Sequence, residues 1–92
     1  MTEQEIQERN KEIAVMLGVD INFFNWDWLM EAVEFIEKLG GSYSISNKSC
    51  AISVNEPYWF GAEIVVKTNE STHKAVFIAV SDFAKLYNEG EL

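Results

Sequence analysis

The side chains of this 92-residue chain that could do acid-base, nucleophilic or metal chemistry are few and lie apart in the sequence. His73 is the only histidine, and it stands beside Lys74 near the expected start of a helix, with no nucleophile close to it in sequence. Cys50 is the only cysteine. It alternates in phase with apolar residues, which predicts a buried structural thiol. We therefore expect no enzymatic activity.

Two short segments resemble ligand-binding motifs only in part. The segment 40–42 (GGS) lacks the length and the lysine of a phosphate-binding loop and follows a helix instead of a strand, so we interpret it as a helix end. Asp20, Asp27 and Glu31 lack the alternating carboxylates and the central glycine of a calcium loop. The sequence therefore predicts neither a cofactor nor a metal site.

Aromatic residues are the unusual feature of the sequence. Trp26 and Trp28 open an expected helix, and Tyr58 and Trp59 open an expected strand. Successive side chains of a strand point to opposite faces, so a buried Tyr58 would put Trp59 on the other face of the sheet. Either a helix of the same chain covers Trp59, or Trp59 anchors a binding partner. Ile78 stands among polar residues of the last expected helix, and it completes a set of five candidate binding residues.

The segment 25–40 (NWDWLMEAVEFIEKLG) has the strongest helical pattern in the chain. Its start is capped by Asn25 or Asp27, and a glycine pair follows its end. Three apolar residues fall on one line of this helix, namely Leu29, Val33 and Ile36. Apolar residues on both sides of this line widen the apolar arc to nearly half the circumference of the helix. Because the apolar arc is so wide, we expect this helix to contact a sheet and at least one other element.

Two further segments have the helical period. The first runs from a cap at Thr2 to Leu17, and we expect its polar first half to project into solvent while its second half packs. The last begins at a cap provided by Asn69 or Ser71 and ends within residues 88–90. It carries a second broad apolar stripe, so it should also pack against the sheet.

Between the second and third helices the apolar period changes from 3.6 to 2, which is typical of strands. Residues 41–46 and 49–54 alternate apolar with small polar side chains, and residues 47–48 between them suit a two-residue hairpin turn. Residues 55–57 break the pattern, and residues 58–67 form a third, longer strand. The three strands are expected to form one antiparallel sheet with an aliphatic face and a serine-rich face.

These elements follow in the order α-α-β-β-β-α and form a single α+β domain over residues 1–92. The sheet is three-stranded, antiparallel and packed by helices. Small side chains on its serine-rich face would either let a helix approach closely or leave a shallow surface for a partner. We expect helices on both faces, in a three-layer α/β/α sandwich.

Acidic side chains outnumber basic ones by 15 to 7, and the formal net charge is −8. Nucleic acid binding depends on clustered Lys and Arg, so this charge argues against direct binding of DNA or RNA. It would also suit a protein that imitates nucleic acid in a basic groove, although net charge commonly serves solubility. With no apolar run of roughly 20 residues and no signal-peptide pattern, we expect a cytoplasmic protein without membrane attachment.

Three blocks of the sequence resemble the phage ABA sandwich domain, a family of small phage- and prophage-encoded proteins. The blocks are residues 10–18 (NKEIAVMLG), 27–40 (DWLMEAVEFIEKLG) and 73–89 (HKAVFIAVSDFAKLYNE), and they cover a little under half of the chain. The resemblance implies a sheet packed between helices and a phage or prophage origin. It supplies no catalytic residues.

Together these observations favour a non-catalytic protein that binds a host or phage protein, as an inhibitor of a bacterial antiviral defence system. The alternative is an oligomeric protein that sequesters a small molecule, such as a nucleotide signal, between its tryptophans. The two hypotheses differ in what they bind, so a ligand-dependent shift in melting temperature separates them.

Overall fold

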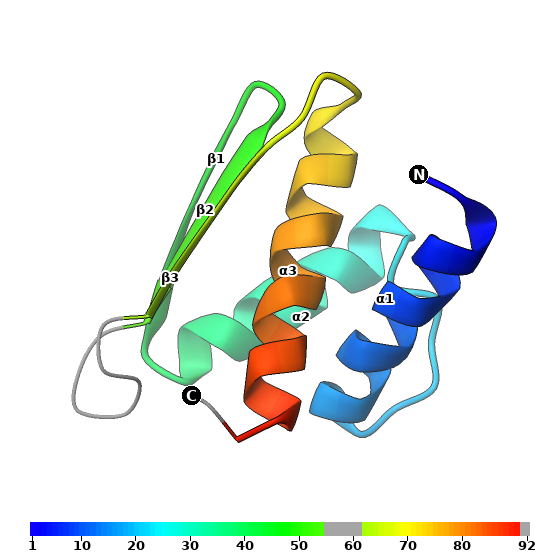
Figure 1. The fold of residues 1–92 in the computed structure, drawn as a ribbon. Helices are drawn as coiled ribbons and strands as arrows, with labels where there is room; N and C mark the ends of the chain where they lie inside the picture. The colour runs from blue at the N-terminus through cyan, green and yellow to red at the C-terminus, as the bar shows by residue number, and fades with distance from the viewer. Residues whose placement is uncertain (55–61, 91–92) are drawn as a thin grey trace.

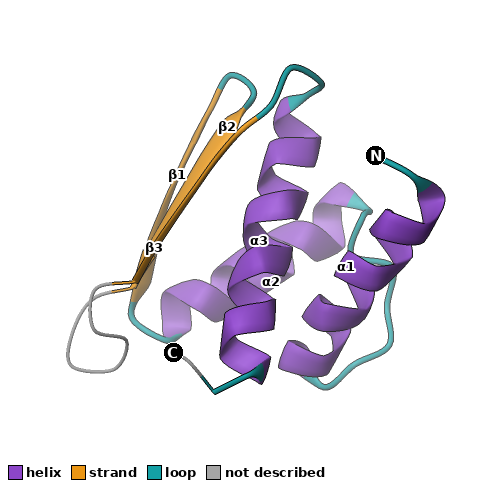
Figure 2. Cartoon of the chain, in the orientation of Figure 1, coloured by secondary structure: helices purple, strands orange, loops and turns teal. Residues whose placement is uncertain are grey.

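The computed structural model describes residues 1–54 and 62–90 of the chain. Three helices and three strands follow one another in the predicted order (Figure 1). They are α1 (Glu3–Leu17), α2 (Trp26–Lys38), β1 (Gly41–Ser46), β2 (Ser49–Val54), β3 (Ala62–Lys67) and α3 (Thr72–Asn88). Helices and strands form separate parts of the molecule, with the sheet along one side (Figure 2). The predicted α+β class is confirmed.

Local capping interactions set the ends of the helices. Thr2 Oγ1 accepts a hydrogen bond from the Glu5 amide at 3.1 Å, as the capping pattern predicts. Gly18 ends α1 with a φ of +74°, a left-handed conformation that glycine adopts without a steric penalty. Of the alternatives left by the sequence, Asn25 caps α2 and Ser71 caps α3.

The sheet has the strand order β1-β2-β3, and both pairs of strands are antiparallel. Ser44 lies opposite Ala51, which lies opposite Val65, so these three residues form a row across one face. The predicted turn at residues 47–48 joins β1 to β2, and Lys48 has a φ of +57° there. Residues 58–61, the first part of the predicted third strand, lie outside the described residues.

The three described helices lie on the same side of the sheet (Figure 1). α3 packs on all three strands and α2 packs on β1, whereas α1 packs on α3 and α2 and, in the described part of the chain, touches no strand. The order of layers is therefore sheet, then α2 with α3, then α1, and not the sandwich with helices on both faces that the sequence suggested. The other face offers little apolar area for a helix to bury, because most of its side chains are small.

We call that other side of the sheet the open face. It comprises the outward residues of the three strands: Ser42, Ser44, Ser46, Ser49, Ala51, Ser53, Glu63, Val65 and Lys67. No helix within residues 1–54 and 62–90 covers it.

α3 is the central helix, and it is buried around most of its circumference. Ser81, one of the polar residues that surround Ile78 in the sequence of this helix, is only 2% exposed. Its hydroxyl donates to the Ile78 carbonyl and accepts from Arg9 Nη1, both at 2.9 Å, and the same guanidinium nitrogen lies 2.8 Å from Asp82 Oδ1. α1 supplies this arginine, so the first half of α1 is docked on α3 and does not project into solvent as expected.

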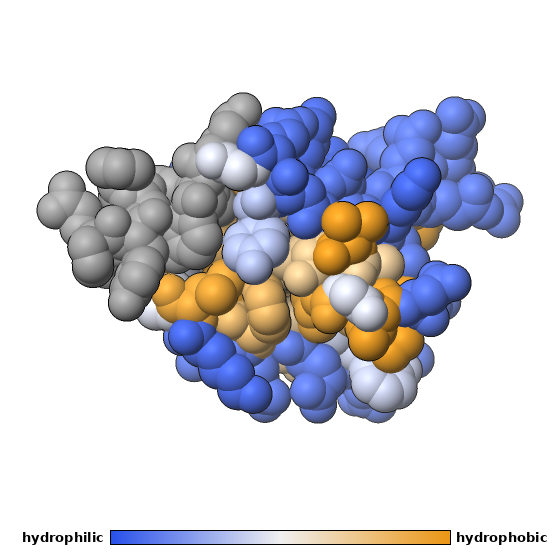
Figure 3. All heavy atoms as spheres, turned by 90° about the horizontal axis from the view of Figure 1, so that it is seen from below, coloured by the Kyte–Doolittle hydropathy of each residue, from blue (hydrophilic) through white to orange (hydrophobic). Residues whose placement is uncertain are grey.

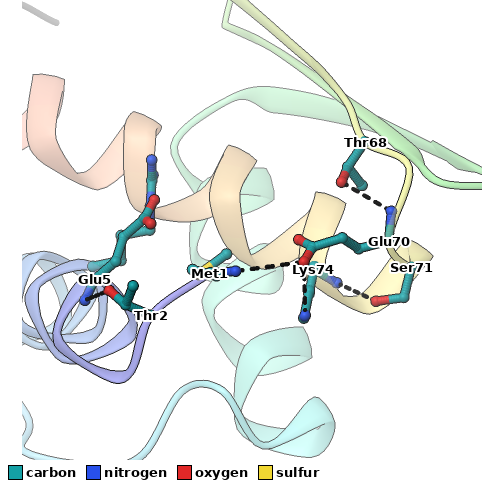
Figure 4. A network of polar contacts seen from close by, with 8 residues as sticks. Met1, Thr2, Glu5, Thr68, Glu70, Ser71 and Lys74 are labelled. Atoms are coloured by element: carbon teal, nitrogen blue, oxygen red, sulfur yellow. Dashed lines mark hydrogen bonds and ion pairs between the residues drawn. The ribbon is translucent and has the colours of Figure 1, made fainter.

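Polar contacts also join the starts of α1 and α3 (Figure 4). The Glu70 carboxylate accepts from Lys74 Nζ at 3.1 Å and from the Met1 amino group at 3.4 Å. The hydrogen bond from Lys74 lowers the pKa of Glu70. Exposed ion pairs contribute little stability. These contacts therefore help to hold the start of α1 beside the start of α3 but add little to the free energy of unfolding.

Candidate protein-binding surface

The connection between α1 and α2 is held by one side chain of α1. Asn10 Nδ2 donates to the Ile21 carbonyl at 2.9 Å, and Asn10 Oδ1 accepts from the Phe23 amide at 2.5 Å. The Phe23 ring is fully buried. A single amide thus satisfies two backbone groups and fixes the path of the chain into α2.

The next residue, Phe24, is fixed by α3. Its ring stacks on the imidazole of His73 with a centroid distance of 4.7 Å and meets the edge of Phe77 at 5.0 Å. His73 Nε2 forms a hydrogen bond with the Phe24 carbonyl. Because a carbonyl oxygen only accepts, Nε2 must carry the proton. His73 therefore supports the start of α2, a structural position and not one beside a nucleophile.

Trp26 and Trp28 belong to the first turn of α2, and together with Asp27 we call them the tryptophan turn. Trp26 is 40% exposed and meets the edge of the His73 ring at 5.4 Å, and Trp28 is 46% exposed. Residues two apart on a helix point about 200° from each other, so the two indoles flank the buried side of the helix and do not stack.

The tryptophan turn combines apolar rings with negative charge. Asp27 is exposed between the indoles, and Glu31 is exposed one turn later. Each indole also offers one N–H donor. Large aromatic side chains with few rotatable bonds, held on a fixed backbone, lose little conformational entropy when a partner covers them. Exposed tryptophans on a fixed backbone are common in protein-binding surfaces, so the tryptophan turn is the candidate binding surface.

The other three candidate residues do not join this surface. Tyr58 and Trp59 lie outside the described residues. Ile78 is half-buried and not exposed as predicted, because the side of α3 that looks polar in sequence faces α1 and its arginine. Of the five candidates, Trp26 and Trp28 are therefore the ones that the structure places in the same turn.

A second apolar surface, at the end of α1, was not predicted. Val15 is 60% exposed and Val19 is also exposed, and both line an open groove of about 580 Å³ with Lys11 and Asp20. Hydrophobic side chains gather on this lower end of the molecule, where α1 and α3 end (Figure 3). The sequence contained one sign of this surface: Val15 is apolar but lies on a different side of its helix from the buried Ile13 and Met16.

Groups suited to catalysis are not brought together in the described residues. Burial raises the pKa of the Cys50 thiol to about 11, so the thiolate needed for nucleophilic attack is scarce near neutral pH. Residues 1–54 and 62–90 contain no group of three or more His, Cys, Asp or Glu side chains placed to hold a metal ion. Among the helices described, none has the length and apolarity to cross a membrane.

Comparison with known protein families, with curated proteins and with solved structures gives no significant match. The resemblance to the phage ABA sandwich domain stays a prediction from three sequence blocks.

Proposed function

We propose that this protein is non-catalytic and acts by binding another protein, as a phage- or prophage-encoded inhibitor of a bacterial antiviral defence system. The observation that supports the binding role is the tryptophan turn, in which two large aromatic side chains stay about half exposed on a rigid helix start. The phage origin rests on the three sequence blocks alone. This role would be exercised in the cytoplasm of the bacterial host.

Charge indicates the kind of partner. The chain carries a net charge of −8, and acidic side chains lie between and beside the two tryptophans. An acidic surface of this kind speeds association with a basic surface and disfavours acidic partners. We therefore propose a partner protein whose binding face is basic and contains apolar pockets for the indoles.

The effect of removing the tryptophans follows from their size. Tryptophans at the centre of an interface commonly contribute about 2 kcal/mol or more each, which corresponds to roughly a 30-fold loss of affinity per residue. Half-exposed side chains at the border of the core contribute less to folding than fully buried ones. The double variant Trp26→Ala/Trp28→Ala should therefore lose binding far more than it loses stability.

Phage infection of bacterial strains that each carry one defence system tests the proposal. Expression of the wild-type protein should restore phage growth in at least one strain, and the tryptophan double variant should not. Val15→Ala, which removes an exposed apolar side chain from another surface, is the matched control and should behave as the wild type. Equal folding of all three proteins is checked by circular dichroism.

Crosslinking in the responsive strain then locates the contact. A photoreactive residue at position 28 should capture a component of the defence system, and one at Glu34, exposed on another side of α2, should not. Equal capture from both positions, or full phage growth with the double variant, would contradict the proposal. A melting shift with a nucleotide, lost in the double variant, would favour the small-molecule alternative instead.

A further inference from the structure

β1 is an edge strand without the features that usually keep edge strands apart. In the described part of the chain its one hydrogen-bonded neighbour is β2. Its sequence GSYSIS contains no charged residue and no proline, and its pairing with β2 is continuous, without a bulge. The opposite edge, β3, carries Glu63 and Lys67. Charges, prolines and bulges are the common protection against edge-to-edge pairing, so β1 is the edge open to a further strand.

The turn determines which backbone groups face outward. A two-residue turn joins Ser46 to Ser49, which makes these two residues the closing hydrogen-bonded pair of the hairpin. Hydrogen-bonded and non-hydrogen-bonded pairs alternate along an antiparallel ladder, so Ser44 also bonds to β2. The amide and carbonyl groups of Tyr43 and Ile45 therefore point to the outer edge, where they are available to another strand.

We propose that β1 pairs antiparallel with β1 of a second copy of this chain, around a two-fold axis at Ser44, to form a continuous six-stranded sheet. In this register Ser44 lies opposite Ser44 of the second copy, and Tyr43 lies opposite Ile45 of the second copy. The outward amides and carbonyls of Tyr43 and Ile45 then bond reciprocally, which is the arrangement that the ladder requires. Tyr43, 42% exposed in one copy, gains an apolar neighbour on the helix side of the sheet.

The charge distribution fits a second copy despite the negative charge on each chain. β1 itself is neutral, so no like charges meet along the strand. At each end of the pair, Lys48 in the turn of one copy comes beside the last turn of α2 in the other, where Glu37 and Lys38 are both exposed. Glu37 and the partial negative charge of the helix C-terminus attract Lys48, and this attraction offsets the repulsion from Lys38.

The position of α2 leaves the helix side of β1 unevenly covered. α2 reaches the sheet with its C-terminal end, next to the first residues of β1 (Figure 1). A two-fold axis at Ser44 would bring α2 of the second copy to the opposite end of β1. A pair of six-residue strands buries little area compared with stable dimers, so the association should be weak and dependent on concentration.

Analytical ultracentrifugation tests the dimer with two matched variants. Wild type should be dimeric at about 200 µM and monomeric at about 2 µM, as expected for a small interface. Ser44→Lys places lysines opposite each other and should stay monomeric at both concentrations. Val65→Lys changes the same row of the open face by the same charge at the other edge, and it should dimerise like the wild type.

A disulfide tests the register directly. In a Cys50→Ala background, Ser44→Cys should form a disulfide-linked dimer under mild oxidation, because opposing residues of a non-hydrogen-bonded pair lie about 4.5 Å apart at Cα. Ser42→Cys should not, since it faces Ser46 of the second copy. A wild type monomeric at the high concentration, a dimeric Ser44→Lys, a monomeric Val65→Lys or crosslinking at position 42 but not at 44 would overturn the proposal. This dimer is independent of the proposed function and is measured without any partner.

Discussion

Asn10→Ala should destabilise the protein and loosen the tryptophan turn. The Asn10 amide makes two hydrogen bonds, at 2.9 Å to the Ile21 carbonyl and at 2.5 Å from the Phe23 amide. Each partly buried bond contributes about 1 kcal/mol net, so the variant should lose about 2 kcal/mol of unfolding free energy. For a domain of this size, that loss corresponds to a fall of about 8–16 °C in Tm.

Urea unfolding followed by circular dichroism measures this loss, and the near-ultraviolet signal of the tryptophans reports on the turn. Gln7→Ala is the control, because Gln7 is exposed on the same helix and its loss should change stability by less than about 0.5 kcal/mol. Equal midpoints for Asn10→Ala and Gln7→Ala, with identical near-ultraviolet spectra, would refute the structural role given to Asn10.

Three further predictions concern packing in α2 and the sheet. Leu29→Ala should cost about 2–5 kcal/mol of stability and Glu31→Ala less than about 0.5 in thermal unfolding, and equal shifts would contradict the orientation of α2. With a pKa of about 11, Cys50 should react with a thiol reagent at neutral pH only as fast as the protein unfolds, and rapid labelling of the native protein would contradict its burial. Gly41→Ala should cost about 1–3 kcal/mol in urea unfolding, because the added Cβ would lie 2.9 Å from the Ile36 carbonyl oxygen; an unchanged midpoint would contradict that close approach.

Features set by neighbouring residues were predictable from the sequence. The buried side of α2 consists of Leu29, Ala32, Val33 and Ile36, as its period predicts, and Cys50 is buried with Ile52 and Val54 on one side of β2. The cap at Thr2 and the end of α1 at Leu17 also follow the expected pattern. Each of these depends on a local hydrogen bond or on the repeat of one element, which the order of residues specifies directly.

The layer order could not be predicted, because it depends on contacts between distant residues. Ser81 and Ile78 look like an exposed side of a helix until Arg9, 72 residues before Ser81, is placed against them. A small hydroxyl that receives a guanidinium donor can be buried, so polarity alone does not indicate exposure. The sequence therefore predicted an amphipathic last helix, whereas α3 is covered on two sides.

The sequence identified the tryptophans of the candidate site but not the residues that hold them in place. The tryptophans at positions 26 and 28 stand out in the sequence, but what fixes them is His73, whose ring contacts Phe24 and Trp26 from the start of α3. His73 and Phe24 are 49 positions apart in the sequence. Nothing in the local pattern around His73 distinguishes it from a solvent-exposed histidine.

The central place of α3 has a consequence for synthesis on the ribosome. α3 contacts every other described element, yet it is the last of the six to be made. Until Thr72–Asn88 has left the exit tunnel, α1 has almost nothing to pack against and the aliphatic side of the sheet stays uncovered. A domain whose core needs its last helix folds only after that helix has emerged, and until then it exposes apolar surface to chaperones and proteases. For this chain, a stalled or truncated translation product that stops before α3 would be a substrate for quality control and not a partly active protein.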